Sequence, residues 1–229
     1  HFYNRHVLNY RHGLYQWILG DLDLSGMRVL DALCGGGENT AFFVDRAASV
    51  EGVGISDEQC RIYAERFPNC RVTCESVIQM HCGDEEFDFV VVDSLHHLHP
   101  SLDQGVAEFV RVLRPGGYLL LWEPSAGSLL NLARRAWYKL DRKYFEENER
   151  AIDLREVVEF SGGRLESLRR KFGGGPGYVF VNGSMLFRFP VKLLDYIAPT
   201  LYGLERGIAP LQGKLLSCWV LALLRKTQS

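Results

Sequence analysis

The sequence predicts an α/β fold in which an open, largely parallel sheet carries helices on both faces. Three observations support this prediction. Short strand-like runs alternate with helix-like stretches over residues 27–123. The run at 87–92 is almost wholly apolar, as expected of a parallel strand buried on both faces. A glycine cluster at 35–37 follows the first strand-like run. Such alternation is typical of a doubly wound sheet, whose right-handed crossovers leave few topologies.

The chain is expected to open with a helix over residues 1–20, because apolar side chains recur on one side of this stretch. Gly20 and the Asp-Leu-Asp-Leu-Ser-Gly stretch that follows end the helix. A short buried strand is predicted at 27–30. Helical spacing resumes at 41–47, after the three glycines.

Further strand–helix units follow. Two helices are predicted to begin at capping boxes, in which a serine is followed by a glutamine three residues later. These boxes are Ser56 with Gln59 and Ser101 with Gln104, and the helices run to about Phe67 and Leu113. The Arg-Pro-Gly-Gly stretch at 114–117 predicts a turn. The predicted strands of this region are residues 50–55, 71–73, 87–92 and 118–122.

The last hundred residues are less regular. Helices are expected at 129–140, 153–160 and 191–211, the last interrupted at Pro199 and Pro210. A strand is expected at 164–172, and the glycine-rich stretch at 173–177 predicts a loop. The run at 216–224 fits a strand or a helix, and a strand is preferred because it would complete the sheet.

Composition narrows the function classes. The 229 residues are 47% hydrophobic with a formal net charge of −2, which favours one domain and argues against non-specific nucleic-acid binding. The apolar runs are too short to cross a bilayer and no secretion signal opens the chain, so a cytoplasmic location is expected. The six cysteines form no CxxC pair and fit free thiols. No metal site is expected, although four residues offer a conceivable ligand set: Cys70, Cys74, His81 and Cys82.

The glycine cluster is the first candidate for a binding site. In doubly wound sheets, ligands bind beyond the carboxyl ends of the strands, at the point where the strand order reverses. Glycines let the backbone turn tightly and approach a ligand closely, since no Cβ intervenes. Gly35, Gly36 and Gly37 would therefore suit a nucleoside or a dinucleotide equally. A plain strand-to-helix turn is the alternative.

Four blocks in order narrow this choice. They are Val-Leu-Asp-Ala-Leu-Cys-Gly-Gly-Gly at 29–37, Gly-Val-Gly-Ile-Ser at 52–56, Phe-Asp-Phe-Val-Val-Val at 87–92 with His-His-Leu at 96–98, and Val-Leu-Arg-Pro-Gly-Gly at 112–117. Together they resemble the motifs of class I S-adenosylmethionine (SAM)-dependent methyltransferases, and the small-molecule group of that superfamily fits best.

The resemblance implies a Rossmann-like sheet of about seven strands, the last antiparallel, with helical cap insertions. It implies one methyltransferase domain over residues 1–229, with SAM as cofactor and a small-molecule acceptor as partner. The expected parts are a lid helix at 1–20, a SAM-binding core at 27–123 and acceptor-side caps at 124–162 and 173–212. The oligomeric state is left open.

The resemblance also assigns a set of residues to the cofactor site: Tyr10, Asp31, Cys34, Gly35, Gly37, Gly54, Ile55, Ser56, Glu75, Ser76 and Asp93. Two positions depart from the family pattern. Leu33 replaces the first glycine of the loop motif, and Gly54 stands where the family usually has an acid that binds the ribose hydroxyls. Ser56 or Glu51 is expected to take over that task.

Methyl transfer to a hydroxyl needs a group that accepts the hydroxyl proton. His96 and His97 follow the fourth predicted strand, at the active edge of the sheet, and histidine titrates near neutral pH. They are the predicted catalytic pair, with Glu123 and His12 as secondary candidates. O-methylation is therefore preferred, while N- and C-methylation stay open.

The cap segments are rich in aromatic and aliphatic residues, which favours an apolar or amphipathic acceptor. A basic face with Arg134, Arg135 and Arg142 fits a solvated surface or peripheral contact with a membrane, without insertion.

Two other function classes stay open. An NAD(P)-dependent oxidoreductase also uses a glycine loop after the first strand, but its motif expects a third glycine or alanine where Thr40 stands, and an acid about 20 residues on. A non-catalytic binding or scaffold protein of the same fold is compatible with the departures at Leu33 and Gly54.

Overall fold

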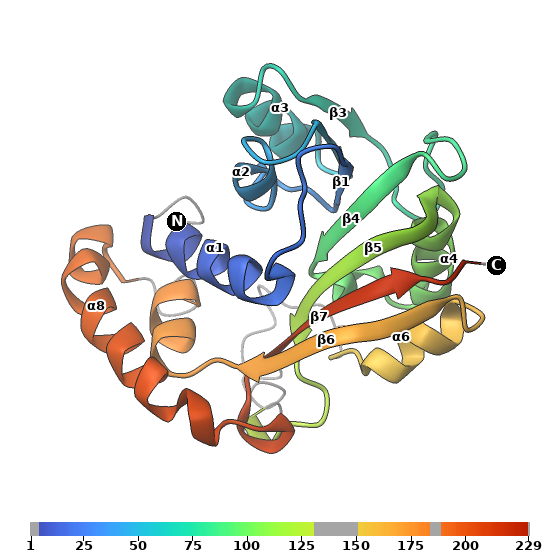
Figure 1. Cartoon of the computed structure of the whole chain (residues 1–229). Coiled ribbons are helices and arrows are strands. Elements are labelled where there is room, and N and C mark those ends of the chain that lie inside the picture. Colours follow the sequence, from blue (N-terminus) through green and yellow to red (C-terminus); the bar gives the residue numbers. More distant parts are fainter. Residues whose placement is uncertain (1–4, 131–150, 184–188, 229) are drawn as a thin grey trace.

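A computed structural model describes residues 5–130, 151–183 and 189–228. Its centre is a seven-stranded sheet with the order β3-β2-β1-β4-β5-β7-β6 (Figure 1). Strands β1 to β5 pair in parallel, whereas β7 runs antiparallel to both β5 and β6. The predicted doubly wound sheet with an antiparallel last strand is confirmed.

The strands are β1 Arg28–Ala32, β2 Ser49–Gly54, β3 Arg71–Cys74, β4 Phe87–Asp93, β5 Leu113–Pro124, β6 Leu165–Gly173 and β7 Trp219–Lys226. The longer helices are α1 Arg5–Leu19, α3 Asp57–Arg66, α4 Leu102–Val112, α6 Leu154–Phe160 and α8 Val191–Ile208. Short helical turns are α2 Thr40–Phe43, η1 Leu95–Leu98, η2 Tyr178–Asn182, η3 Ala209–Leu211 and η4 Lys214–Leu216.

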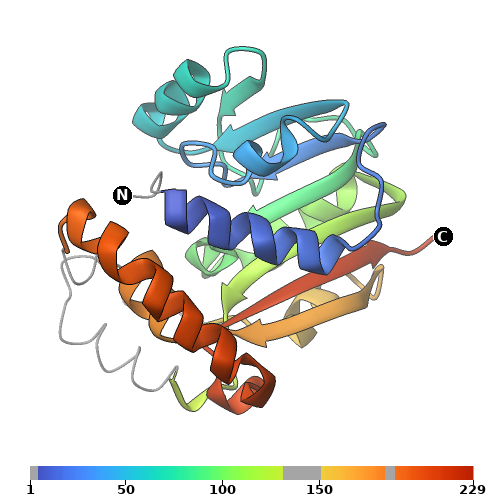
Figure 2. The same cartoon turned by 60° about the vertical axis from the view of Figure 1, so that its left-hand side comes forward.

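Alternate residues of the central strands build two hydrophobic cores. On one face, Val90 and Val92 of β4 pack in a cluster with side chains of α4 and α6. On the other, Val91 packs in a cluster with Tyr15 and Ile18 of α1. Figure 2 shows α1 lying across the sheet on this second face. Helices cover both faces of the sheet, which explains why β4 is apolar on both sides. The candidate polar residues lie at the carboxyl ends of the strands.

Several predicted elements differ in detail. The helix expected at 41–47 is a single turn, α2. The Arg-Pro-Gly-Gly stretch lies within β5 and is not a separate turn, since Leu113 already pairs with Phe87 before a register shift in the ladder. Gly116 there has φ +77°, which lets the strand bend without breaking. The strand expected at 216–224 is confirmed as β7.

The capping predictions have different outcomes. Ser56 caps α3 by accepting a hydrogen bond from the Gln59 N–H at 3.4 Å. Ser101 precedes α4, but its side chain makes no cap hydrogen bond. Pro199 lies at an exposed position inside α8 without interrupting the helix, whereas α8 ends at Ile208 and Pro210 lies in the following turn η3.

The helix expected at 129–140 lies almost wholly outside the described residues, as do Arg134, Arg135 and Arg142. Among the residues that are described, no helix combines the length and the apolar character needed to cross a membrane.

Candidate cofactor and acceptor site

The strand order reverses between β1 and β4. The chain runs outward from β1 to β2 and β3, and then returns to place β4 on the other side of β1. The loop after β1 and the turn η1 after β4 therefore diverge at the carboxyl edge of the sheet. In doubly wound folds this switch point is where ligands bind.

The loop after β1 is tightly coiled. Gly35 and Gly37 have φ angles of +50° and +90°, and Leu33 has +60°. A Cβ at Gly37 would lie 2.3 Å from a ring carbon of Phe67, so only glycine fits there. Leu33 adopts a conformation that costs a non-glycine residue about 1–2 kcal/mol, while its side chain packs against the core on the α4 face. The departure at Leu33 is thus accommodated by packing away from the loop.

Asp31 anchors the far end of this loop. Its buried carboxylate accepts hydrogen bonds from Asn39 Nδ2 at 3.0 Å, and from the Thr40 N–H and hydroxyl at 3.0 and 2.8 Å. Burial raises the pKa of Asp31 to about 7, against the opposing effect of these hydrogen bonds. Asp31 therefore holds the carboxyl end of the loop in place through its hydrogen bonds with Asn39 and Thr40. Cys34 is also buried, which raises the pKa of its thiol and favours the neutral form.

Arg11 of α1 was missed at the sequence level, and it links this helix to Asn39 and to Asp93 at the end of β4. Its Nη1 donates to Asn39 Oδ1 at 2.5 Å and to Asp93 Oδ2 at 2.7 Å. The guanidinium also lies 4.6 Å from the ring centroid of Trp122. Burial opposes its charge, but Asp93 and Tyr15 outweigh that effect and raise the pKa of Arg11. A lone arginine on the apolar face of a helix was the available signal.

Buried polar atoms without a partner gather at this edge. Among the described residues, Arg11 Nε, Trp122 Nε1 and Ser125 Oγ have no hydrogen-bond partner, although each side chain is almost fully buried. Ser94, next to Asp93, has a left-handed φ of +69°. Unpaired buried donors and backbone strain are costly, and they concentrate where a ligand completes the bonding. These residues therefore fit a polar ligand.

The end of β2 offers an exposed apolar side chain and a hydroxyl. Ile55 is 74% exposed, and Ser56 follows it at the start of α3. At Gly54, a Cβ would lie 3.2 Å from the Sγ atoms of both Cys34 and Cys60, so the ribose-binding acid of the family would be tightly placed here. Glu51 sits in mid-strand in an ion pair with Arg28 at 3.2 Å. Of the two expected substitutes, Ser56 alone lies at the carboxyl edge.

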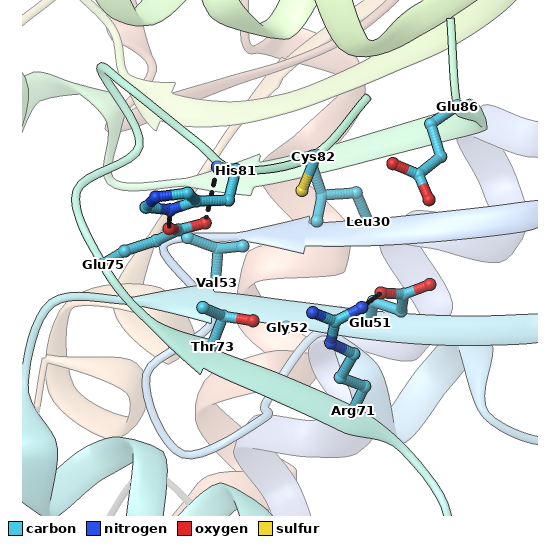
Figure 3. A pocket seen from close by; sticks show the side chains of 10 residues that line it. All are labelled: Leu30, Glu51, Gly52, Val53, Arg71, Thr73, Glu75, His81, Cys82 and Glu86. Atoms are coloured by element: carbon cyan, nitrogen blue, oxygen red, sulfur yellow. Dashed lines mark hydrogen bonds and ion pairs between the residues drawn. The ribbon is translucent and has the colours of Figure 1, made fainter. Parts of the chain in front are cut away.

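Glu75 follows β3 and lines a small cavity of about 150 Å³ under the 75–86 connection. Its carboxylate accepts a hydrogen bond from the His81 N–H at 3.1 Å and pairs with the His81 ring (Figure 3). The Glu75 N–H donates to the Gly54 carbonyl at 2.8 Å, which ties the β3 exit to the β2 exit. Ser76 is the next residue of the same connection.

The turn after β4 presents a histidine–glutamate pair. Glu123, near the end of β5, is 1% exposed, and its Oε2 lies 2.8 Å from His96 Nδ1. The same carboxylate accepts hydrogen bonds from the N–H groups of Leu95 and His96. The β4–β5 register, Asp93 opposite Trp122, brings these residues together. Glu123 therefore fixes both the turn and the orientation of the His96 imidazole.

The other two histidine candidates lie differently. The His97 ring is 4.3 Å from the His96 ring, centroid to centroid, and is exposed. His12 packs edge-on against Phe42, and burial lowers its pKa. The structure thus groups His96, His97 and Glu123 and leaves His12 on the α1–α2 contact.

Tyr10 faces the aromatic cluster between α1 and α8. Its hydroxyl donates to Glu205 and accepts from Trp219 Nε1 at 3.1 Å, and its ring stacks on Tyr202 at 5.0 Å. Burial and Glu205 raise the pKa of Tyr10. The expected cofactor residue is thus bonded to α8 and β7 through its hydroxyl, while its ring lies 6.3 Å from that of Trp122.

Comparisons with known proteins agree with this geometry. A family described as "Methyltransferase domain" matches residues 29–117. Phthiotriol/phenolphthiotriol dimycocerosates methyltransferase 1 of Mycobacterium ulcerans is 32% identical over 111 residues, covering 47% of this chain and 41% of that protein. A fatty-acid O-methyltransferase of Mycolicibacterium smegmatis is 29% identical over 111 residues, covering 47% and 40%. The chain thus matches about two fifths of the length of these relatives.

Among solved structures, N-methyltransferase NodS of Bradyrhizobium japonicum in complex with S-adenosyl-L-homocysteine superposes with a TM-score of 0.61. The superposition covers 98% of this chain and 89% of NodS at 15% identity, and at that identity it shows the shared fold. The domain match includes the glycine loop, the switch point and the Arg-Pro-Gly-Gly stretch, and so favours SAM over a nicotinamide cofactor. Residues 29–117 therefore match a methyltransferase domain, and the chain shares its fold with SAM-dependent methyltransferases.

Proposed function

We propose that the protein transfers a methyl group from SAM to a hydroxyl oxygen of an apolar or amphipathic small molecule. The observation that carries the proposal is the buried His96–Glu123 pair at the switch-point edge, beside the glycine loop. A histidine oriented by a buried carboxylate through one ring nitrogen can accept a proton at the other.

Several described residues fit the cofactor. The backbone turns tightly at Gly35 and Gly37, with φ +50° and +90°, and is proposed to approach the nucleoside. The exposed Ile55 suits the flat face of adenine, and Ser56 offers a hydroxyl to the ribose. The remaining residues proposed for the cofactor site are Tyr10, Asp31, Cys34, Gly54, Glu75, Ser76 and Asp93. Arg11, which the sequence analysis did not include, is a further candidate, because its buried cation suits the carboxylate of the methionine part. When bound, SAM supplies an electrophilic methyl group on a sulfonium.

The chain's own residues then have defined tasks. His96 Nδ1 is paired with Glu123, so Nε2 is the nitrogen that takes the proton of the acceptor hydroxyl. Glu123 stabilises the imidazolium that results, since it is buried and negatively charged. Helix α1 shields the site from water through the Arg11 contacts with Asn39 and Asp93. His97 is proposed to contact the acceptor.

Support for an apolar acceptor comes from the surrounding side chains. Near the end of β5, the Trp122 ring lies 6.2 Å from the ring of Tyr178 and 6.1 Å from the ring of Trp219, centroid to centroid. The fatty-acid O-methyltransferase and the phthiotriol/phenolphthiotriol dimycocerosates methyltransferase among the relatives carry names that fit acceptors of this class. The caps at 124–162 and 173–212 are the proposed acceptor-side segments.

The test combines calorimetry with a transfer assay. We expect saturable SAM binding, and formation of S-adenosyl-L-homocysteine when hydroxylated lipids are added. SAM binding with no transfer to any acceptor would favour a binding or scaffold role. Binding of NADH without SAM binding would refute the proposal.

A further inference from the structure

A second cavity lies away from the glycine loop. It has a volume of about 390 Å³ and sits between α1, the carboxyl end of β6 and the carboxyl half of α8. No residue of the glycine loop, of η1 or of the His96–Glu123 pair lines it. Tyr10 forms part of its wall, and on its other flank the Tyr10 ring lies 6.3 Å from that of Trp122. The volume is within the range of roughly 300–1,000 Å³ typical of small-molecule sites.

The walls of the cavity are mainly apolar, and glycine residues, which have no side chain, form part of them. Leu14, Trp17, Phe172 and Trp219 contribute side chains. Gly13 faces the cavity from the middle of α1, and a Cβ built there meets no atom within 4 Å. Since a helix-interior glycine is unfavourable relative to alanine, its presence here is consistent with a need for space along α1.

Two cations border this apolar space. The Lys171 ammonium lies 4.3 Å from the Trp17 ring centroid, and burial lowers the pKa of Lys171. Arg206 lines the same cavity from α8. Among the described residues, neither forms an ion pair at 4 Å or less. Lys171 is half-buried and Arg206 is exposed, and both cations can form charge-assisted hydrogen bonds with a carboxylate.

The acidic groups nearby are already engaged. Glu205 is 5% exposed, accepts from the Tyr10 hydroxyl, and accepts from the Tyr178 N–H at 2.7 Å. Asp195 pairs with His6 at 3.0 Å and with Arg5 at 3.7 Å. The cations of the lining are therefore Lys171 and Arg206, while the Glu205 carboxylate belongs to the same lining and is held by the Tyr10 hydroxyl and the Tyr178 N–H.

We propose that this cavity binds an anionic amphiphile with one linear apolar chain, of the long-chain carboxylate class. The chain lies along Leu14, Trp17 and Phe172 beside Gly13, and the carboxylate meets Lys171 and Arg206. This site goes beyond the proposed methyl transfer: it shares Tyr10, Trp219 and part of the 173–212 cap with the proposed site, but no residue of the cofactor loop or of the catalytic pair lines it.

The test uses dodecanoate at submillimolar concentration, followed by tryptophan fluorescence and by calorimetry. We expect saturable binding with a change in the emission of Trp17 and Trp219, and clearly weaker binding of dodecanol, which lacks the charge. Gly13→Leu should abolish binding by filling the cavity, while Gly13→Ala should retain it. Both variants should unfold at a temperature no lower than that of the wild type.

Lys171→Met should weaken dodecanoate binding about tenfold, as loss of one charged contact implies. Arg170→Met is the matched control, because neighbouring residues of a strand point to opposite faces, and it should bind as the wild type does. Wild-type-like binding by Gly13→Leu, or no saturable binding to the wild type, would overturn the proposal. SAM titration of the same samples tests the proposed function separately: Gly13→Leu should bind SAM normally.

Discussion

Replacing Glu123 with glutamine removes one negative charge from the buried pair while keeping the shape of the side chain. In the structure the Glu123 carboxylate accepts three hydrogen bonds, from the Leu95 N–H, the His96 N–H and His96 Nδ1. A glutamine has one oxygen that can accept, and its NH₂ group would face a donor. At least one of these hydrogen bonds must then be lost.

The magnitude follows from the kind of bond that is lost. A hydrogen bond to a charged group contributes about 1.5–3 kcal/mol, which corresponds to about a 10- to 150-fold change in rate when it acts in the transition state. The partner is the imidazolium that forms as the acceptor loses its proton. We therefore expect Glu123→Gln to lower kcat about 100-fold, with little change in the affinity for SAM, because Glu123 is proposed to act on the acceptor side.

The assay measures S-adenosyl-L-homocysteine formed per turnover over a range of pH, together with SAM affinity by calorimetry. Glu108→Gln is the matched control, since Glu108 also accepts a backbone N–H, that of Met80 at 3.0 Å, but lies on α4. A Glu123→Gln enzyme with kcat within twofold of the wild type, and an unchanged pH profile, would refute the role assigned to the pair.

Three further predictions concern the loop and the lid. Gly37→Ala should destabilise the fold by about 2–4 kcal/mol and abolish SAM binding, because its Cβ would clash with Phe67 at φ +90°. Gly26→Ala is the control, since a Cβ at Gly26 meets no atom within 4 Å. Normal SAM binding by Gly37→Ala would contradict the loop assignment. Burial raises the pKa of Asp31 to about 7, so the folded state binds the Asp31 proton more tightly than the unfolded state does. About 4 kcal/mol of folding stability that is present near pH 4 is therefore lost as the pH rises to about 7. Denaturant unfolding should show the wild type losing more stability than Asp31→Asn over this window, and parallel pH curves would exclude the effect. Gly13→Ala should raise the free energy of unfolding by about 0.5–1 kcal/mol. A lowered thermal midpoint would show that the space beside Gly13 does not accommodate a Cβ.

Local patterns predicted much of the fold. The strand and helix alternation and the Ser56 cap are properties of short stretches, and the structure agrees with them. The final strand was ambiguous locally and was preferred because it completes the sheet, as β7 does. The exceptions have tertiary causes. Pairing with β4 draws Arg114–Gly117 into β5, and the exposed side of α8 tolerates Pro199. The periodicity of the sequence predicts neither the strand pairing around Arg114–Gly117 nor the exposure of Pro199.

The candidate site was partly predictable for a related reason. Asp31 and the glycines could be assigned because they end a recognisable strand and form the loop that follows it. His96 could be assigned because it comes soon after another recognisable strand. The partnership of His96 with Glu123 depends on the register between β4 and β5, 27 positions apart in the chain. Arg11 reaches Asp93 across 82 positions. Such long-range pairs are set by packing, and only the structure reveals them.

The most direct measurement of the central claim is a calorimetric titration of the wild-type protein with S-adenosyl-L-homocysteine, run beside Gly37→Ala. The geometry at the β1 exit predicts one saturable binding event per wild-type chain and none for the variant. Absence of heat with the wild type, or equal binding by a folded Gly37→Ala protein, would show that this loop does not hold the nucleoside.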